Sequence, residues 1–125
     1  MNNLAKLAAA LVGLFSIVMG LMAWVDPAKV GGIIGLEGVG VLGEHSLRGD
    51  VGAVFLASAL GCGLALFKGK TVALKIPIII YGLVLIGRLI SLVAVGAGEG
   101  VMQPILIEVA LVALSIFAYR TLSKA

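Results

Sequence analysis

Two ionisable side chains lie deep inside apolar runs of this 125-residue sequence. Arg88 interrupts the run YGLVLIGRLISLVAV, residues 81–95, and Glu108 lies five residues beyond Gln103 in another run. Estimates for placing a charge at the centre of a bilayer run from about 3 to well above 10 kcal/mol, so such residues are functional hypotheses by default. An arginine there needs a facing carboxylate, and its guanidinium can bridge two of them. These two residues could therefore form an ion pair. The pair would either only hold two helices together or, in addition, bind a polar ligand.

The composition indicates a membrane protein. Hydrophobic residues make up 62% of the chain and charged residues only 12%, whereas soluble domains are closer to half apolar and a quarter charged. The net charge of +3 comes from basic residues that flank the apolar runs, as in membrane proteins. The aromatic surfaces that single-stranded nucleic acids stack on are missing, which argues against nucleic-acid binding.

Four apolar runs, at about 4–24, 50–67, 72–95 and 103–119, are each near the length of a membrane-spanning helix. Backbone groups in lipid need internal partners, and the alternating pattern of a β-barrel is absent. The sequence therefore predicts an all-α membrane protein, a single four-helix transmembrane bundle over residues 1–125. A glycine-rich loop, residues 26–49, would connect the first two helices on the outer side.

Lysine and arginine positions predict the orientation. Lys6, Lys68, Lys70 and the C-terminal Arg120 and Lys124 fall at one end of the predicted bundle. The other end carries mostly acidic side chains: Asp26, Glu37, Glu44 and Glu99. The positive-inside rule then places both termini in the cytoplasm, and we expect a multi-pass protein of the bacterial inner membrane.

The second predicted helix carries a small residue at every fourth position: Gly49, Ala53, Ala57, Gly61 and Ala65. This small-residue stripe is typical of membrane helices that approach one another closely. It predicts tight packing within the bundle or, equally, a subunit interface, and the sequence does not choose between them.

The helical rise places the charged residues of consecutive helices at similar depths in the membrane. At 1.5 Å per residue, Arg88 lies on the order of 10 Å below the outer end of its helix, and Glu108 roughly 8 Å below the start of the next. We therefore predict an Arg88–Glu108 ion pair, with Asp50 as the second candidate acceptor. Arg48 and Asp50, two residues apart, point to different sides of one helix, whereas Glu44 can pair with Arg48 if that helix begins early.

Tyr81, seven residues before Arg88, and Ser91, three after it, extend the polar face of the third helix. The predicted ligand-binding residues are Arg48, Asp50, Tyr81, Arg88, Ser91 and Glu108. Alternatively, these charges sum to zero and only fix the helix register, with the hydroxyls bonded to neighbouring carbonyls. A proton relay is the third interpretation.

No catalytic, metal or cofactor site is predicted. The sequence has one histidine, His45, and one cysteine, Cys62, too few for a metal cluster or an internal disulfide. Residues 38–43, GVGVLG, match the spacing of a dinucleotide-binding loop but lie between two membrane helices rather than in a βαβ unit. The loop around them is expected either to cover the charged cluster or to pack at the interface.

The segments LRGDVGAVFLASALGCGLAL and GRLISLVAVG, followed by a helix with Glu108, resemble a family of small four-helix bacterial membrane proteins of unknown function, similar in layout to DoxX-like proteins. Arg48, Gly52, Arg88, Ser91 and Glu108 carry the resemblance, together with Leu89 and Gly96. A departure is Ala94-Val95 before Gly96, where the pattern has an acidic residue. DoxX relatives are associated with quinone-linked oxidation, so the resemblance implies at most a quinone near the protein.

Three functions remain open on the sequence. The first is a non-enzymatic protein that binds a small amphiphilic or lipophilic molecule, such as a quinone, at the charged cluster within the lipid bilayer. The second is an accessory subunit or homo-oligomer that packs through the small-residue stripe. The third is a membrane enzyme or redox partner using Asp50 or Glu108 as a proton donor.

Overall fold

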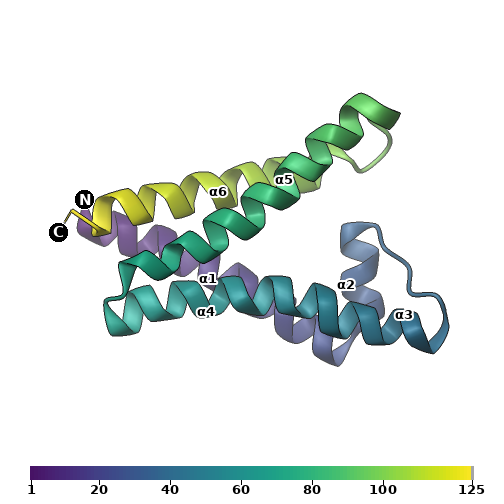
Figure 1. The fold of residues 1–125 in the computed structure, drawn as a ribbon, viewed down its shortest axis with the longest axis horizontal. Helices are drawn as coiled ribbons and strands as arrows, with labels where there is room; N and C mark the ends of the chain where they lie inside the picture. Colours follow the sequence, from purple (N-terminus) through teal and green to yellow (C-terminus); the bar gives the residue numbers. More distant parts are fainter. Residues whose placement is uncertain (125) are drawn as a thin grey trace.

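The computed structural model describes residues 1–124, and within that range the chain is helical without strands. In chain order the elements are α1 (Asn2–Val25), α2 (Pro27–Ile34), α3 (Gly40–Ser46), the π-helix η1 (Leu47–Val51), α4 (Gly52–Lys68), the 3₁₀-helix η2 (Thr71–Leu74), α5 (Lys75–Val95) and α6 (Met102–Leu122). Four helical segments are long and apolar enough to cross a membrane: Asn2–Val25, Gly40–Lys68, Thr71–Val95 and Met102–Leu122. Both termini lie at the same end of the bundle, opposite α2 and α3 (Figure 1).

Helix α1 packs between α4 and α6 and makes extensive contacts with both. Its buried residues recur at helical spacing and are mostly small, running from Ala5 to Ala23. Glycines of α1 let α4 approach closely. A Cβ on Gly20 would lie 2.5 Å from the Leu56 side chain of α4, and one on Gly13 would lie 3.0 Å from the Cβ of Cys62. Small residues at such contacts let membrane helices gain dispersion energy over a long surface.

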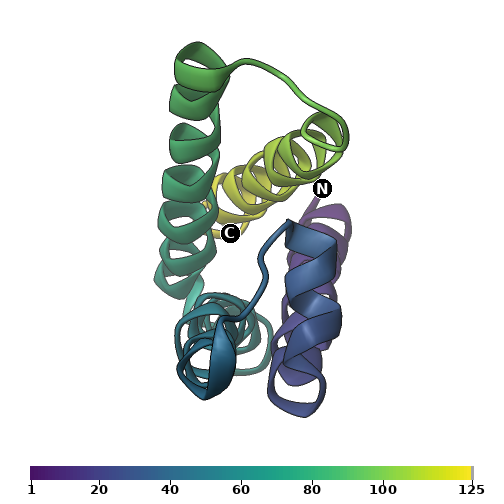
Figure 2. The ribbon, with the colours of Figure 1, turned by 90° about the vertical axis from the view of Figure 1, so that its right-hand side faces the viewer.

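Helix α5 packs on α6 and, near its first turn, on α4. Its buried residues are Pro77 and Tyr81, both in its first half. Towards the end that carries α2 and α3, α5 stands away from α4 (Figure 1), and the view along the bundle shows α5 apart from α2 (Figure 2). The helices are therefore closely packed near the termini and spread apart at the opposite end.

The connection 26–49, predicted as a loop, is largely helical, and this corrects the prediction. Asp26 caps α2, its side chain accepting a hydrogen bond from the Lys29 backbone N–H at 3.3 Å, and Pro27 occupies the first turn. Gly35 ends α2 in the left-handed conformation, φ 81°. From Gly40 the chain is helical through α3 and η1 into α4, so the second long helix begins about ten residues earlier than position 50.

The small-residue stripe does not form one continuous contact. Gly61 and Ala65 are buried, Ala57 is half-buried, and Gly49 and Ala53 are exposed. Gly61 packs against η2 and the start of α5, where a Cβ would lie 2.6 Å from the Ala73 carbonyl oxygen. Gly49 lies within the π-helix, whose i→i+5 hydrogen bonds break the four-residue phase of the helix that follows.

Candidate functional site: an ion pair on the wall of a cavity

The ion pair predicted between the third and fourth long helices is present. Arg88 of α5 donates from Nε to Oε1 of Glu108 on α6 at 2.7 Å. The Glu108 side chain is 10% exposed and that of Arg88 29% exposed. A charge-assisted hydrogen bond of this length offsets much of the cost of placing both groups among apolar helices.

The pairing uses a single hydrogen bond. Oε2 of Glu108 is buried and has no hydrogen-bond partner within the described residues. The terminal amino groups of Arg88 likewise make no hydrogen bond to residues 1–124. Arginine and carboxylate commonly pair through two parallel hydrogen bonds, and an unsatisfied buried acceptor costs about 1–3 kcal/mol. The pair therefore keeps an acceptor and several donors for a third group.

A cavity of about 910 Å³ borders this pair, a size typical of small-molecule sites. All four long helical segments, α2, and the turn between α5 and α6 contribute to its wall. Most of the lining is apolar, including Phe15, Met19, Ile33, Val84, Ile107 and Leu111. Besides Arg88 and Glu108, the polar side chains are those of Tyr81, Glu99 and Gln103. The cavity thus combines an apolar body with one charged pair.

Tyr81 and its neighbours connect the cavity to the close-packed part of the bundle. The hydroxyl of Tyr81 lies 2.6 Å from that of Ser16 on α1, and both residues are buried. Phe55 of α4 contacts the Phe15 ring edge to face, with centroids 6.1 Å apart, and lies 6.4 Å from the Tyr81 ring. These contacts fix three helices around one end of the cavity.

Three predicted site residues lie outside the cavity. Arg48 pairs with Glu44 at 3.1 Å and donates from Nε to the Trp24 carbonyl oxygen at 2.9 Å, because the helix does begin early. Asp50 is exposed and forms no ion pair with Arg88. Ser91 is exposed near the C-terminal end of α5 and makes no side-chain hydrogen bond within the described residues. The cavity therefore brings together Tyr81, Arg88 and Glu108 but not these three.

Two polar residues of the cavity wall are absent from the prediction. Glu99 and Gln103 lie in and after the turn that joins α5 to α6. The signal was available, since a short connection must pass near the ends of both helices that carry the ion pair. The sequence pattern alone predicts only that Glu99 is an acidic residue at the outer end and that Gln103 begins a helix.

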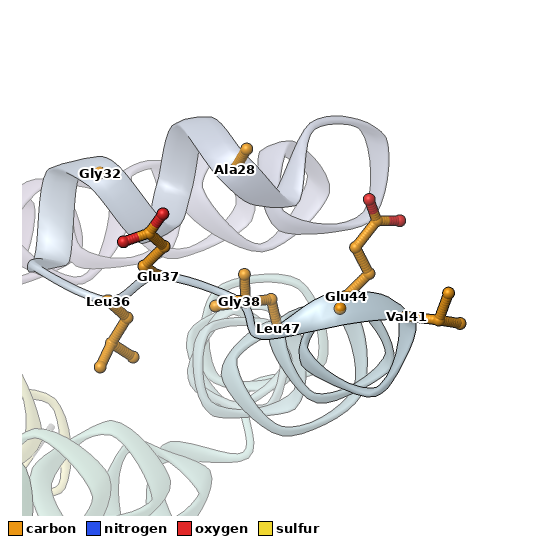
Figure 3. A pocket seen from close by; sticks show the side chains of 9 residues that line it. Ala28, Gly32, Leu36, Glu37, Gly38, Val41, Glu44 and Leu47 are labelled. Carbon is orange, nitrogen blue, oxygen red and sulfur yellow. The ribbon is translucent and has the colours of Figure 1, made fainter.

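A second hollow, of about 760 Å³, lies between α2 and α3. Figure 3 shows Glu37 and Glu44 beside it, with Ala28 and Gly32 on the α2 side. Both glutamates are exposed, and Glu44 is already paired with Arg48. Within residues 1–124 no group of three or more metal-ligating side chains occurs, here or elsewhere. This hollow is a surface feature and has no buried polar group to hold a ligand.

Comparison with known proteins gives a family and no established activity. The family model described as Domain of unknown function (DUF4345) matches residues 4–119, so the chain belongs to that family. Neither the curated proteins nor the solved structures contain a significant match. The match does not extend to DoxX-like proteins, and that part of the resemblance stays a sequence-based prediction.

Proposed function

We propose that this member of the DUF4345 family is a non-enzymatic binding protein of the bacterial cytoplasmic membrane. In this proposal it holds one small lipophilic or amphiphilic molecule in the cavity beside Arg88 and Glu108. The polar end of the molecule contacts the ion pair, and its apolar body lies against Phe15, Ile107 and Leu111. A quinone is one molecule of this kind.

The observation that carries the proposal is the incomplete hydrogen bonding of the ion pair. A pair that only fixed helix register would gain most by using both carboxylate oxygens, because unsatisfied buried acceptors are costly. Here Glu108 Oε2 has no partner in the described residues, although Glu108 lines a cavity large enough for a ligand. Ligand sites in proteins typically combine an apolar lining with a few convergent polar groups, as this cavity does.

The proposed orientation places both termini in the cytoplasm. Lys6, Lys68, Lys70 and Arg120 belong to the end of the bundle with the termini, and Lys75 Nζ lies 5.6 Å from the centroid of the Tyr119 ring there. Basic residues concentrate on the cytoplasmic side of bacterial membrane proteins. The cavity then lies in the outer half of the bilayer.

Native mass spectrometry of the purified protein tests the proposal. We expect a bound small molecule on the wild type and its loss from folded Arg88→Gln protein. Arg48→Gln is the matched control, because it removes an arginine of an ion pair outside the cavity. Equal retention by the wild type and Arg88→Gln, or bare protein throughout, would reject the proposal.

A subunit role in a homo-oligomer or larger membrane complex is the second candidate. It is supported by the exposure of Gly49 and Ala53, the part of the small-residue stripe that does not pack within the chain. Ala53→Leu should then dissociate a complex in mild detergent, with Leu60→Ala, on an exposed position of α4, as the control. An unchanged oligomeric mass for Ala53→Leu would count against this role.

A further inference from the structure

We infer that the ligand of the cavity is electrically neutral and that its polar end donates a hydrogen bond, as the hydroxyl of a long-chain alcohol does. This inference rests on the proposed function and names the chemical class that the same site would select. The groups that carry it are Oε2 of Glu108 and the terminal amino groups of Arg88.

The acceptor left open on Glu108 requires a donor. A carboxylate is an acceptor-only group, so Oε2 is satisfied by an O–H or N–H and repelled by a carbonyl or ether oxygen. Of a quinone and its reduced form, the inference therefore selects the quinol, which carries hydroxyl groups. The Glu108 carboxylate rotates easily about its Cγ–Cδ bond, because this terminal torsion has a broad energy well. Both oxygens turn together about this torsion, so bringing Oε2 to a donor in the cavity that Glu108 lines also shifts Oε1 from its 2.7 Å contact, and the Arg88 side chain must follow it.

The terminal amino groups of Arg88 can donate hydrogen bonds to the oxygen of the same ligand group. A hydroxyl has one donor and two acceptor lone pairs, so one oxygen can donate to Glu108 and accept from Arg88. An ether or ester oxygen offers only the second of these contacts. Each hydrogen bond to a charged group contributes about 1.5–3 kcal/mol, equivalent to about tenfold to a hundredfold in affinity.

Charge excludes ionic ligands. Arg88 and Glu108 already neutralise one another at 2.7 Å, so an added anion lies beside the Glu108 carboxylate without a counter-charge of its own. An added cation lies beside the Arg88 guanidinium and competes with it for Glu108. Glu99, the other charged residue of the wall, is exposed, and solvent screens its charge.

The test uses probes that share one alkyl chain. Dodecanol, dodecyl methyl ether, dodecanoate and dodecylamine are added together to the delipidated protein, and the bound masses are read by native mass spectrometry. The ratio of wild type to Glu108→Gln for each probe cancels its partition into detergent. Glu44→Gln is the matched control, a glutamate paired with an arginine outside the cavity.

Glu108→Gln keeps the shape of the side chain and an acceptor for Arg88 but puts an N–H₂ group in place of Oε2. We expect the wild type and Glu44→Gln to prefer dodecanol over the ether by about tenfold or more, and Glu108→Gln to lose that preference. Glu108→Gln should also bind dodecanoate more tightly than the wild type does, because the charge of Arg88 is then no longer neutralised. If Glu108→Gln does not fold, the order of probe affinities on the wild type, corrected for the partition of each probe into detergent, tests the inference.

The two levels of the proposal fail differently. Equal binding of alcohol and ether, or tighter binding of dodecanoate or dodecylamine than of dodecanol, overturns the inference and leaves a lipophilic site in place. Retention of none of the probes, on a wild type that also carries no molecule after purification, overturns the proposed function with it.

Discussion

The hydroxyl oxygens of Tyr81 and Ser16 lie 2.6 Å apart, although the residues are 65 positions apart in the chain. This hydrogen bond joins α5 to α1 at the depth where the cavity begins. No residue of α5 after Tyr81 is buried, and towards its last residues α5 stands away from α4 (Figure 1). Within residues 1–124 it is the side-chain hydrogen bond that connects α5 to α1.

Removing this hydrogen bond should destabilise the bundle modestly. Tyr81→Phe keeps the ring against Phe55 and deletes only the hydroxyl. Hydrogen bonds between membrane helices average about 0.6 kcal/mol and reach about 1.7 kcal/mol, so a loss within that range is expected. SDS-titration unfolding measures it. Adding Ser16→Ala to Tyr81→Phe should cost little more, and full additivity of the two losses would show that the contact contributes nothing.

The ion pair should be much more sensitive to loss of one partner than of both. Arg88→Gln leaves the buried Glu108 carboxylate unpaired, and breaking such a pair costs about 3–5 kcal/mol. Glu108→Gln should cost less, because the Arg88 side chain retains 29% exposure. The double variant should be more stable than the sum of the single losses predicts, by at least about 1 kcal/mol in the same unfolding titration. Additive losses would indicate two independent residues.

Filling the cavity should displace the ligand without touching the ion pair. Val84 lines the cavity, and Val84→Trp places an indole where the apolar body of the ligand is proposed to lie. We expect the bound mass in native mass spectrometry to disappear. Leu83→Trp is the neighbouring control, since Leu83 is 63% exposed and not part of the cavity wall. Retention of the molecule by Val84→Trp would place its site elsewhere.

Close packing of α4 on η2 should depend on Gly61. The Cβ of Gly61→Ala would lie 2.6 Å from the Ala73 carbonyl oxygen, so the backbone of η2 must move. Overpacking of this kind costs about 1–3 kcal/mol. Gly63→Ala, on the same helix with its nearest atom 4.0 Å away, should instead be neutral or stabilise α4 by up to about 1 kcal/mol. Thermal unfolding in detergent distinguishes them, and equal stabilities would mean that η2 adapts freely.

The proposed orientation predicts which loops are accessible from each side. In a Cys62→Ala background, Lys70→Cys should react with a membrane-impermeant thiol reagent only after the cells are opened. Gly98→Cys, in the turn between α5 and α6, should react on intact cells. The reverse pattern would place the termini outside and the cavity in the inner half of the membrane.

The ion pair was predictable, and its surroundings were not. Arg88 and Glu108 are single charges in long apolar runs of consecutive helices, and the rise per residue places them at one depth. Ser91 follows Arg88 by three residues but is exposed, on the part of α5 that stands away from α4 (Figure 1). The separation of two helices at one end depends on all the contacts along their length, so it cannot be predicted from a short stretch of sequence.

The region between the first two spans shows a second limit. Asp26 and Pro27 are the start signal of a helix and Gly35 is its end, yet the glycines within PAKVGGII favour the interpretation as a loop. The early start of the next helix aligned Glu44 with Arg48, which removed Arg48 from the predicted site. Asp50, the second candidate acceptor for Arg88, lies in η1, is exposed and forms no ion pair with Arg88.

The packing of α1 between α4 and α6 has a consequence for biogenesis. Its main partners are α4 and α6, which leave the ribosome later than α2. Until α4 and α5 enter the bilayer, the face of α1 that carries Gly13, Ser16 and Gly20 is covered only by lipid or by the insertion machinery. We therefore expect α1 to wait as an independently inserted span until α4 arrives, and the bundle to be completed only when α6, the last helix made, joins it.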